Sequence, residues 1–432
     1  MPKFASKFLL MAIVLMAGTH ANAVVTIEID EGVKRGIPIA IVPFGLPEGI
    51  DQEFDLDEVI RSDLSRTGRF EVKELESFLQ TPTIVEDVVF ADWQLIGVDY
   101  LVIGSLQRIE EGIFRTEARL FNVFNEKLIF GSQFLITADN DRKVMHHIAN
   151  EVYQRVTGAK SSFNTKIAYS VASVSSEGKP EHKLVVSDYD GFNATTILKS
   201  ENPILSPSWS PNSNMIAYSI LDRDQSKIWI QDVSSGDRRV VANIEGQNRS
   251  PSWSPDGSRL AFTNSIEGNS DIFVYTFASG EIIRLTSHRR IDTEPAWSPD
   301  SDYIVFTSNR GKGAQIYRVR AKENQTIERM TIYGKSNSQA SYSPSGKQLI
   351  LITDQGKGNQ VGILDVETKT VSVVSSTSID DSAVFSPNGE LLMYIVEGRD
   401  RHIGILSPDG GVRSRIKVID GAVKQVAWGS DN

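Results

Sequence analysis

The sequence contains no cysteine among its 432 residues. That absence excludes disulfide bridges, thiolate nucleophiles, zinc or iron–sulfur sites with cysteine ligands, and a lipid anchor on an N-terminal cysteine. Histidine is scarce, with six residues, and the motifs G-x-S-x-G, G-x-x-x-x-G-K-[ST], G-x-G-x-x-G and H-E-x-x-H are missing. A formal net charge of −10 argues against nucleic acid as the main partner, because phosphate binding requires clustered Lys and Arg.

Long apolar runs are also missing, except at the N-terminus. Lys3 and Lys7 precede the apolar run Phe8–Ala17, and the small residues of Ala21-Asn22-Ala23 follow it. This order is typical of a secretory signal peptide, residues 1–23, that is cleaved after Ala23. The alternative is a membrane anchor, but spanning a bilayer takes about 18 to 20 apolar residues. The sequence therefore predicts an exported protein with neither a lipid anchor nor a helical anchor.

A repeated pattern fills the C-terminal part of the chain. Its aromatic positions recur at intervals of 43 to 45 residues: Trp209, Trp253, Trp297, Tyr342, Phe385 and Trp428. The copy that begins at Trp253 continues through the turn Ser254-Pro255-Asp256-Gly257 into alternating segments at 259–263 and 271–277. Each copy has room for four short strands and no helix, which is the signature of a β-propeller blade.

The first and last copies are incomplete and complement each other. The first has three strands near residues 167–170, 184–187 and 195–198, whereas the last has only the aromatic strand 426–428. We therefore predict six blades over residues 161–432, with the C-terminal strand as the innermost strand of the first blade. This closure leaves no long unpaired sheet edge. The aromatic side chains are predicted to fill the space between blades.

Residues 37–160 predict a small α/β domain. The expected elements are an apolar buried strand at 37–44, a helix at 55–68, three consecutive strands at 98–108, 114–124 and 127–137, and a helix at 141–157. The last helix carries Val144, Ile148, Val152 and Val156 on one face, and residues 159–164 form a short linker. The predicted fold class is thus mainly β, with a six-bladed β-propeller preceded by a small α/β domain.

Residues 24–36 lie between the signal peptide and this domain. Apolar and polar residues alternate in Val24, Val25, Thr26, Ile27, Glu28, Ile29 and Asp30. One interpretation is an edge strand packed on its own domain. The other is a mobile segment, hinged at Gly32 and Gly36, that leaves and adds itself to the sheet of a partner.

The residues predict neither a metal site nor a cofactor. His146 and His147 are neighbours on the last helix, where consecutive side chains point about 100° apart. The segment 188–193 weakly resembles a calcium loop, but its position matches the turn between the outer strands of a blade. An enzyme would need convergent carboxylates in the channel, and the inner-strand residues Ser208 and Ser252 do not supply them. A pocket for a small ligand stays possible.

Several features together resemble the TolB family. They are the export signal, the start V-x-I-x-I-D-x-G, the strand Pro38–Phe44, the segments Lys166–Tyr169 and Ser187–Gly191, and the six repeats. The resemblance implies a monomeric, non-enzymatic periplasmic protein of the Tol-Pal system of Gram-negative envelopes. In that family the propeller binds the outer-membrane lipoprotein Pal, and the N-terminal segment binds the C-terminal domain of the inner-membrane protein TolA. The system helps the outer membrane invaginate during cell division and keeps it intact.

The resemblance also implies two binding sites. The TolA-binding segment matches residues 24–30. The Pal site of the family lies at the mouth of the ring, where loops enter the innermost strands. It matches Gln247, Asn248, Arg249, Ser250, Asp292, Thr293 and Glu294 and, by repeat symmetry, Asn337, Gln339, Asp380 and Asp381.

The same resemblance implies a coupled switch. The N-terminal segment would alternate between its own protein and TolA, with Pal shifting the balance by its difference in affinity for the two states. Gln247 stands where some relatives carry His, so a role for a ring nitrogen is not implied there. The alternative function is a periplasmic propeller that binds a small ligand or acts as a hydrolase or lyase.

Overall fold

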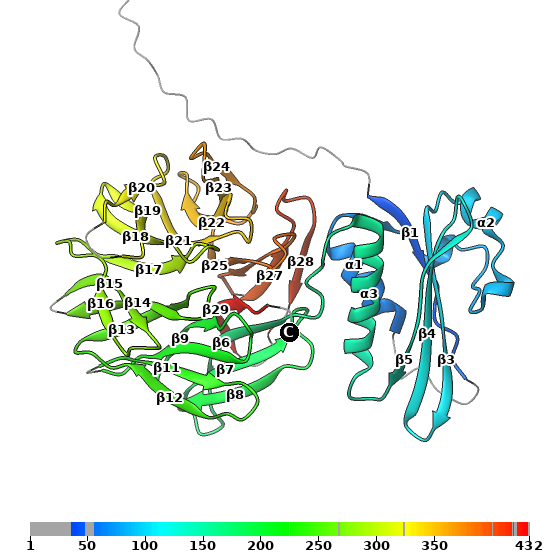
Figure 1. Cartoon of the computed structure of the whole chain (residues 1–432), viewed down its shortest axis with the longest axis horizontal. Helices are drawn as coiled ribbons and strands as arrows, with labels where there is room; N and C mark the ends of the chain where they lie inside the picture. The colour runs from blue at the N-terminus through cyan, green and yellow to red at the C-terminus, as the bar shows by residue number, and fades with distance from the viewer. Residues whose placement is uncertain are drawn as a thin grey trace, which may run out of the picture.

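The computed structural model describes residues 36–47, 56–223, 225–266, 268–322, 325–399, 401–416, 418 and 421–430. The predicted signal peptide and the segment 24–35 lie outside these residues. Among the described helices, none combines the length and the apolar character needed to cross a bilayer. Figure 1 shows an α/β domain beside a ring of short sheets.

The α/β domain is built on a five-stranded sheet in the order β2-β1-β3-β4-β5. Its strands are β1 Ile37–Ile41, β2 Phe70–Val72, β3 Tyr100–Glu110, β4 Ile113–Asn122 and β5 Lys127–Ile136. Strand β1 lies between β2 and β3 and runs parallel to both, whereas β3, β4 and β5 form an antiparallel meander. Ile39, Ala40 and Ile41 are fully buried because both faces of β1 are covered, as the unbroken apolar run predicts.

Two helices cover one face of this sheet and lie between it and the ring (Figure 1). They are α1 Leu56–Arg66 and α3 Asp141–Thr157, and Gly158 ends α3 with a φ of 76° that favours glycine. The buried side of α3 is rotated from the predicted face. Ile148 and Val152 are buried with Met145, Ala149 and Tyr153, whereas Val144 and Val156 are half-buried.

The ring is a β-propeller of six four-stranded sheets, which confirms the predicted fold. From the innermost strand outward, the first three blades are β29 Ala422–Trp428, β6 Lys166–Val174, β7 Pro180–Asp188, β8 Thr195–Ser200; β9 Ile204–Trp209, β10 Met215–Ile220, β11 Lys227–Asp232, β12 Arg238–Ala242; and β13 Gln247–Trp253, β14 Arg259–Ile266, β15 Asn269–Thr276, β16 Ile282–Arg284. The other three are β17 Asp292–Trp297, β18 Tyr303–Gly311, β19 Gly313–Arg320, β20 Glu328–Arg329; β21 Ser336–Tyr342, β22 Gln348–Asp354, β23 Asn359–Asp365, β24 Val371–Val373; and β25 Asp380–Phe385, β26 Leu392–Val396, β27 His402–Leu406, β28 Arg413–Ile416.

The C-terminal strand closes the ring as predicted. Strand β29 pairs antiparallel with β6, with Trp428 opposite Ile167. The indole Nε1 of Trp428 donates a 2.7 Å hydrogen bond to Oγ1 of Thr165. The first blade therefore consists of one strand from the end of the chain and three from the start of the propeller, so closure depends on residues more than 250 positions apart.

The aromatic residues of the inner strands pack between neighbouring blades. Trp297 of the fourth blade lies in one buried cluster with Ala261 and Val274 of the third. Its indole Nε1 also donates a 3.0 Å hydrogen bond to the carbonyl of Ser252. These contacts are the ones that close packing of wedge-shaped blades requires.

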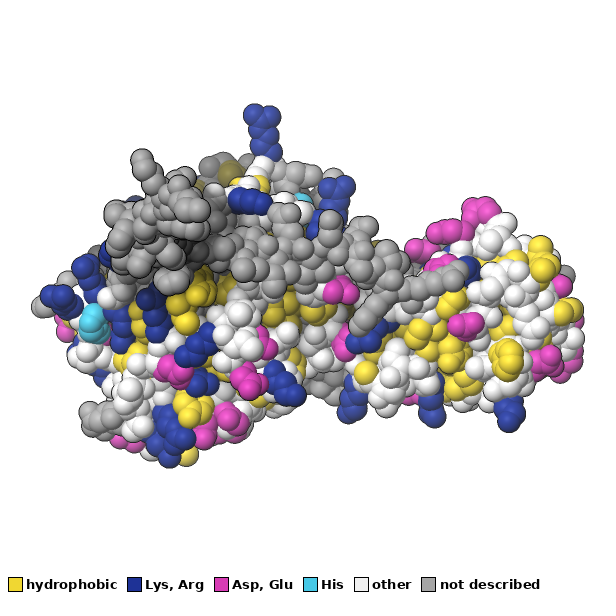
Figure 2. Space-filling view, turned by 90° about the horizontal axis from the view of Figure 1, so that it is seen from above, with side chains coloured by type: hydrophobic (Ala, Val, Ile, Leu, Met, Phe, Trp, Pro, Cys, Tyr) yellow, Lys and Arg dark blue, Asp and Glu magenta, His cyan; other side chains and the backbone are white. Residues whose placement is uncertain are grey.

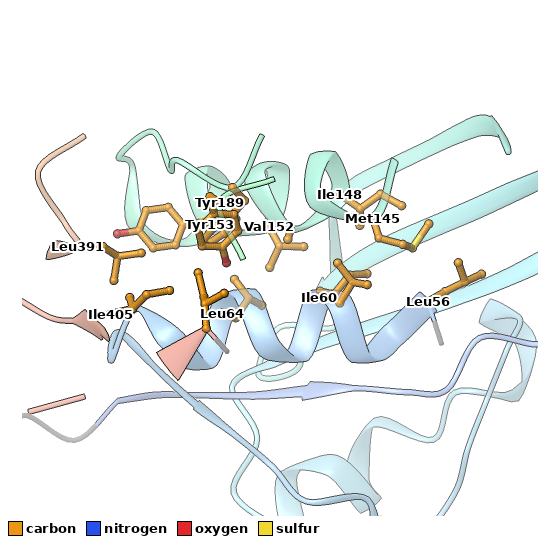
Figure 3. Packing of buried hydrophobic residues seen from close by; sticks show 14 of the residues in the cluster. Leu56, Ile60, Leu64, Met145, Ile148, Val152, Tyr153, Tyr189, Leu391 and Ile405 are labelled. Carbon is orange, nitrogen blue, oxygen red and sulfur yellow. The ribbon is translucent and has the colours of Figure 1, made fainter. Parts of the chain in front are cut away.

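The two domains share one hydrophobic core. Leu64 of α1 and Tyr153 of α3 belong to the same buried cluster as Leu391 and Ile405 of the sixth blade (Figure 3). Phe163, in the segment that joins the domains, is also buried in this cluster. The predicted linker is thus a packed segment and not a solvated tether, because one of its side chains supplies part of the core.

Candidate functional site

The direction of the strands defines two ends of the propeller. Each inner strand starts at one end, which we call the mouth, and the loops from the second to the third strand return to the same end. The eleven propeller residues that the family resemblance and the repeat symmetry assign to a Pal site all lie between the start and the middle of β13, β17, β21 or β25. The structure therefore brings them together at the mouth, on four consecutive blades.

Four of these eleven residues are buried. They occupy the same place in each blade, five positions before the aromatic residue: Asn248, Asp292, Asn337 and Asp380. Nδ2 of Asn248 donates to the carbonyls of Ser226 and Ile244, at 2.9 and 2.8 Å. Asp292 accepts a 2.6 Å hydrogen bond from Nη2 of Arg310. These side chains anchor the loops of the mouth, and a partner would contact them only indirectly.

The other assigned residues include three with unusual backbone geometry. Ser250, Glu294 and Gln339 have φ values of 50°, 56° and 54°, which is the left-handed region that non-glycine residues rarely adopt. Ser206 and Ser382 hold the equivalent places in their blades, with φ values of 53° and 50°. All five lie within or beside shifts in register between the inner strand and the second strand. The repeat therefore encodes a bulge in the inner strand.

This bulge allows hydrogen bonds from each inner strand to a neighbouring blade. The bonds have lengths between 2.5 and 3.3 Å, and each joins a backbone N–H to a side-chain oxygen. They are Ser206 to Gln425, Trp253 to Ser208, Glu294 to Thr263, Gln339 to Glu294, Ser382 to Gln339, and Val426 to Ser382. These bonds span all six junctions, and the backbone N–H of Gln339 donates a second one, at 3.0 Å, to Oγ1 of Thr307. The set offsets the backbone strain of the five bulged residues.

Glu294 lies in the wall of the central channel. Its carboxylate accepts hydrogen bonds of 2.7 Å from Oγ1 of Thr307 and 3.1 Å from the backbone of Gln339. Burial raises the pKa of Glu294 above its ordinary value, and these two hydrogen bonds oppose the shift. The channel contains a cavity of about 310 Å³, and among its described lining residues Glu294 supplies the sole carboxylate. This lining does not provide the paired carboxylates of a glycosidase-like centre.

The mouth is also where apolar side chains are exposed. The described part of the propeller has eight exposed large hydrophobic residues, and six lie at the mouth: Val174, Ile266, Ile291, Ile332, Tyr333 and Ile379. Exposed cations lie in the same loops, among them Arg249, Arg289, Arg290, Lys312 and Lys335. Apolar side chains surrounded by charged ones are typical of a surface that binds another protein.

A second polar cluster lies between the two domains. Nδ1 of His146 lies 2.6 Å from Oδ2 of Asp63, and its Nε2 lies 3.7 Å from Oδ2 of Asp190. Arg142 forms an ion pair with Asp190, and Nη1 of Arg66 lies 3.5 Å from Oδ1 of Asp63. One ligand atom from each of Asp63, His146 and Asp190 lies within 4.8 Å of the others, as a metal site would require. The two guanidinium groups already neutralise both carboxylates, so we assign this cluster to domain docking and not to a metal.

Sequence reasoning missed this cluster. Asp63 and His146 are separated by 83 positions, and Asp190 belongs to the turn between β7 and β8. The positions of His146 and His147 on one helix do not show that Asp63 of α1 and Asp190 of a distant turn lie beside His146. One available signal was the acidic pair of the turn at 188–190, which the sequence had suggested only as a weak calcium loop.

These features define a β-propeller protein with an α/β domain packed against it and a mouth that exposes both apolar and charged side chains. A family model described as the TolB amino-terminal domain matches residues 25–129, and one described as the TolB beta propeller domain matches residues 153–432. The chain belongs to the TolB family.

Solved and curated relatives agree with this membership. The crystal structure of TolB from Acinetobacter baumannii aligns with a TM-score of 0.82 and 32% identity, over 91% of this chain and 96% of that one. The Tol-Pal system proteins TolB of Nitrosococcus oceani and Xylella fastidiosa (strain 9a5c) are both 36% identical, over 52% and 49% of this chain and 51% and 48% of their own lengths. The chain thus spans about half the length of the curated relatives that it matches.

Proposed function

We propose that this protein is a non-enzymatic component of the Tol-Pal system whose propeller mouth binds the lipoprotein Pal. The observation that carries the proposal is the gathering of exposed apolar side chains at the mouth, where six of eight such residues of the described propeller lie. Apolar anchors within a polar rim supply most of the affinity of protein interfaces. Binding to Pal would hold the protein at the outer membrane.

The proposal extends to the N-terminal segment and to the location. Residues 24–30 bind the C-terminal domain of TolA, and the mature protein is a periplasmic monomer released by cleavage after Ala23. The alternating pattern of the segment supports addition of a strand to a partner's sheet. Linking Pal with TolA would contribute to outer-membrane invagination during cell division and to envelope integrity.

The alternative, a hydrolase, lyase or small-ligand propeller, has less support. The described lining of the channel offers one carboxylate, and that group is already hydrogen-bonded to Thr307 and Gln339. The exposed groups lie on the surface around the mouth and do not converge on the cavity. A surface of this kind fits a protein better than a small substrate.

The test is a calorimetric titration with a soluble Pal domain. Ile332→Asp places a charge on an apolar mouth residue that is 55% exposed, and we expect at least a tenfold loss of affinity, which is about 1.4 kcal/mol. Met215→Asp, at the opposite end of the second blade, is the matched control and should leave the affinity unchanged. Equal affinities for the two variants would place the Pal site elsewhere.

A deletion separates the two proposed sites. Removing residues 24–35 should abolish binding to the TolA domain and leave the mouth able to bind Pal. If the deletion instead abolished Pal binding and spared TolA binding, the assignment of the two surfaces would be wrong.

A further inference from the structure

A second surface lies at the end of the α/β domain farthest from the propeller. We call residues 74–99 the distal lobe; it contains the short helices η1 Leu75–Ser77, η2 Val85–Asp87 and α2 Phe90–Leu95. Figure 1 shows α2 on the side of the sheet away from α1 and α3. The lobe therefore covers the second face of the sheet, as α1 and α3 cover the first.

The inner side of the distal lobe is a core. Trp93 is 1% exposed and packs with Val42, Leu101 and Phe121 of the sheet, and the ring of Phe78 lies 5.0 Å from that of Trp93. These contacts bury the apolar residues that the lobe needs for its own stability. Any other large apolar side chain on the lobe is in excess of that need.

The outer side of the lobe carries such an excess. Five of its large hydrophobic residues are exposed, and a sixth lies in the turn after β4: Leu75, Leu79, Ile84, Val89, Leu95 and Phe124. Leu95 is 78% exposed and Phe124 is 88% exposed. Nε2 of Gln94 donates a 3.1 Å hydrogen bond to the carbonyl of Val123, which holds α2 against that turn. Leu95 and Phe124 follow these two residues in the chain, so they belong to adjoining segments.

The charge of the lobe has one sign. Between Lys73 and Arg108 the sequence has no Lys or Arg and six acids: Glu74, Glu76, Glu86, Asp87, Asp92 and Asp99. Five of these are exposed, and Asp92 is half-buried. In Figure 2, hydrophobic and acidic side chains gather at this end of the molecule.

We propose that the distal lobe is a docking surface for a basic segment of a partner protein, one that presents Lys or Arg together with at least two apolar side chains. The apolar residues would be buried on contact, and the six carboxylates select for cations and steer them to the surface. The same charge repels nucleic acid and anionic lipid headgroups, which excludes both as occupants. The inference does not depend on the Tol-Pal assignment, because the mouth and the lobe are separate surfaces.

A second copy of this chain is a weaker candidate for the occupant. The mouth is rich in cations such as Arg289 and Arg290, so the mouth of one copy could meet the lobe of another. Such a contact joins two different surfaces and would not close, so copies would continue to add as an open filament. A chain that stays monomeric in sedimentation velocity would rule that arrangement out.

The experiment is a calorimetric titration, at low salt, of the full chain with an amphipathic helical peptide made of leucine and lysine. We expect saturable binding at a 1:1 ratio that weakens by at least tenfold in the double variant Leu95→Ser/Phe124→Ser and falls again in high salt. The matched control is Ile109→Ser/Leu135→Ser, which removes two exposed apolar residues of the same domain outside the lobe and should bind like the unmodified chain.

Four outcomes would overturn the inference. They are no binding to the unmodified chain, equal loss in the two double variants, equal binding of a leucine–glutamate peptide, and self-association in sedimentation velocity that Leu95→Ser/Phe124→Ser abolishes. The last would assign the lobe to a second copy of the chain. Circular dichroism of both double variants checks that a loss of binding does not come from unfolding.

Discussion

The hydroxyl of Tyr189 donates a 2.6 Å hydrogen bond to Oδ1 of Asp63 and so joins the first blade to α1. Both side chains are fully buried. Tyr189→Phe keeps the ring and removes this donor from a buried carboxylate, which should cost about 1 to 3 kcal/mol. Urea denaturation measures the loss.

The matched control for this variant is Tyr218→Phe. That hydroxyl is also buried, but it donates to the neutral Oε1 of Gln231 within one blade, at 2.9 Å. We expect a smaller loss, about 0.5 to 1.5 kcal/mol. If Tyr189→Phe cost no more than Tyr218→Phe, the bond to Asp63 would not be a principal contact between the domains.

His146 should make stability depend on pH. Burial lowers the pKa of His146, but the charges of Asp63 and Asp190 and the hydrogen bond to Asp63 outweigh burial, so the pKa is raised above its ordinary value. A raised folded-state pKa gives a stabilising contribution that is complete below the unfolded pKa of about 6.5 and is lost as pH rises through the folded pKa. The free energy of unfolding should therefore decline above about pH 6.5.

Two variants of neighbouring residues test this dependence. His146→Gln should remove the decline, whereas His147→Gln should keep it, because the exposed ring of His147 contacts Phe134 and lies outside the cluster. Denaturation at several pH values, with the unmodified chain beside both variants, measures it. A decline that persists in His146→Gln would assign the dependence to another group.

The sequence was sufficient to predict the fold because the repeat is explicit. An aromatic residue every 43 to 45 positions fixes the blades, and the two incomplete copies fix the closure through β29. Short apolar runs such as the one at Ile37–Ile41 predict buried strands without knowledge of their neighbours. The prediction of the buried side of α3 was partly wrong: Met145 and Tyr153 are buried there, whereas Val144 and Val156 are only half-buried. That side packs mainly against α1 and β5, and the α3 sequence alone does not show how these two elements approach it.

The mouth was predictable only in part. Repeat position correctly brings Gln247, Thr293 and Asp381 to one end, but it does not distinguish them from the buried anchors Asn248 and Asp292 one residue away. In a regular strand, alternate side chains are buried and exposed. The bulge in the inner strand breaks that alternation, so the sequence does not show which residues are buried. Hydrogen bonds between blades are likewise invisible until the ring is closed.

Glu294 should make the protein less stable as pH rises, whereas a carboxylate whose pKa is lowered by folding makes it more stable. Because burial raises its pKa, the folded chain binds the proton more tightly than the unfolded chain does, and stability should fall as pH rises from the unfolded pKa through the folded one. Glu294→Gln keeps an acceptor for Thr307 and removes the charge, so this variant should be at least as stable as the unmodified chain at neutral pH.

The control for Glu294 is Glu328. Hydrogen bonds from Lys369 and Arg318 lower the pKa of Glu328, so Glu328→Gln should lose stability at neutral pH. Thermal denaturation at neutral and acidic pH compares the two variants. A loss for Glu294→Gln as large as that for Glu328→Gln would show that the channel carboxylate is stabilised in its charged form.

Trp428 should link ring closure to domain docking. Its ring stacks on Tyr189 with centroids 6.2 Å apart, its Nε1 bonds to Thr165, and its backbone completes the first blade. Trp428→Ala should therefore cost about 3 to 5 kcal/mol and also loosen the segment 158–165 between the domains. Trp253→Ala is the control, since Trp253 stacks on Phe277 within the third blade, at 4.8 Å, and touches neither the closure nor the docked domain. Limited proteolysis should cut the segment 158–165 faster in Trp428→Ala only; equal rates in both variants would separate closure from docking.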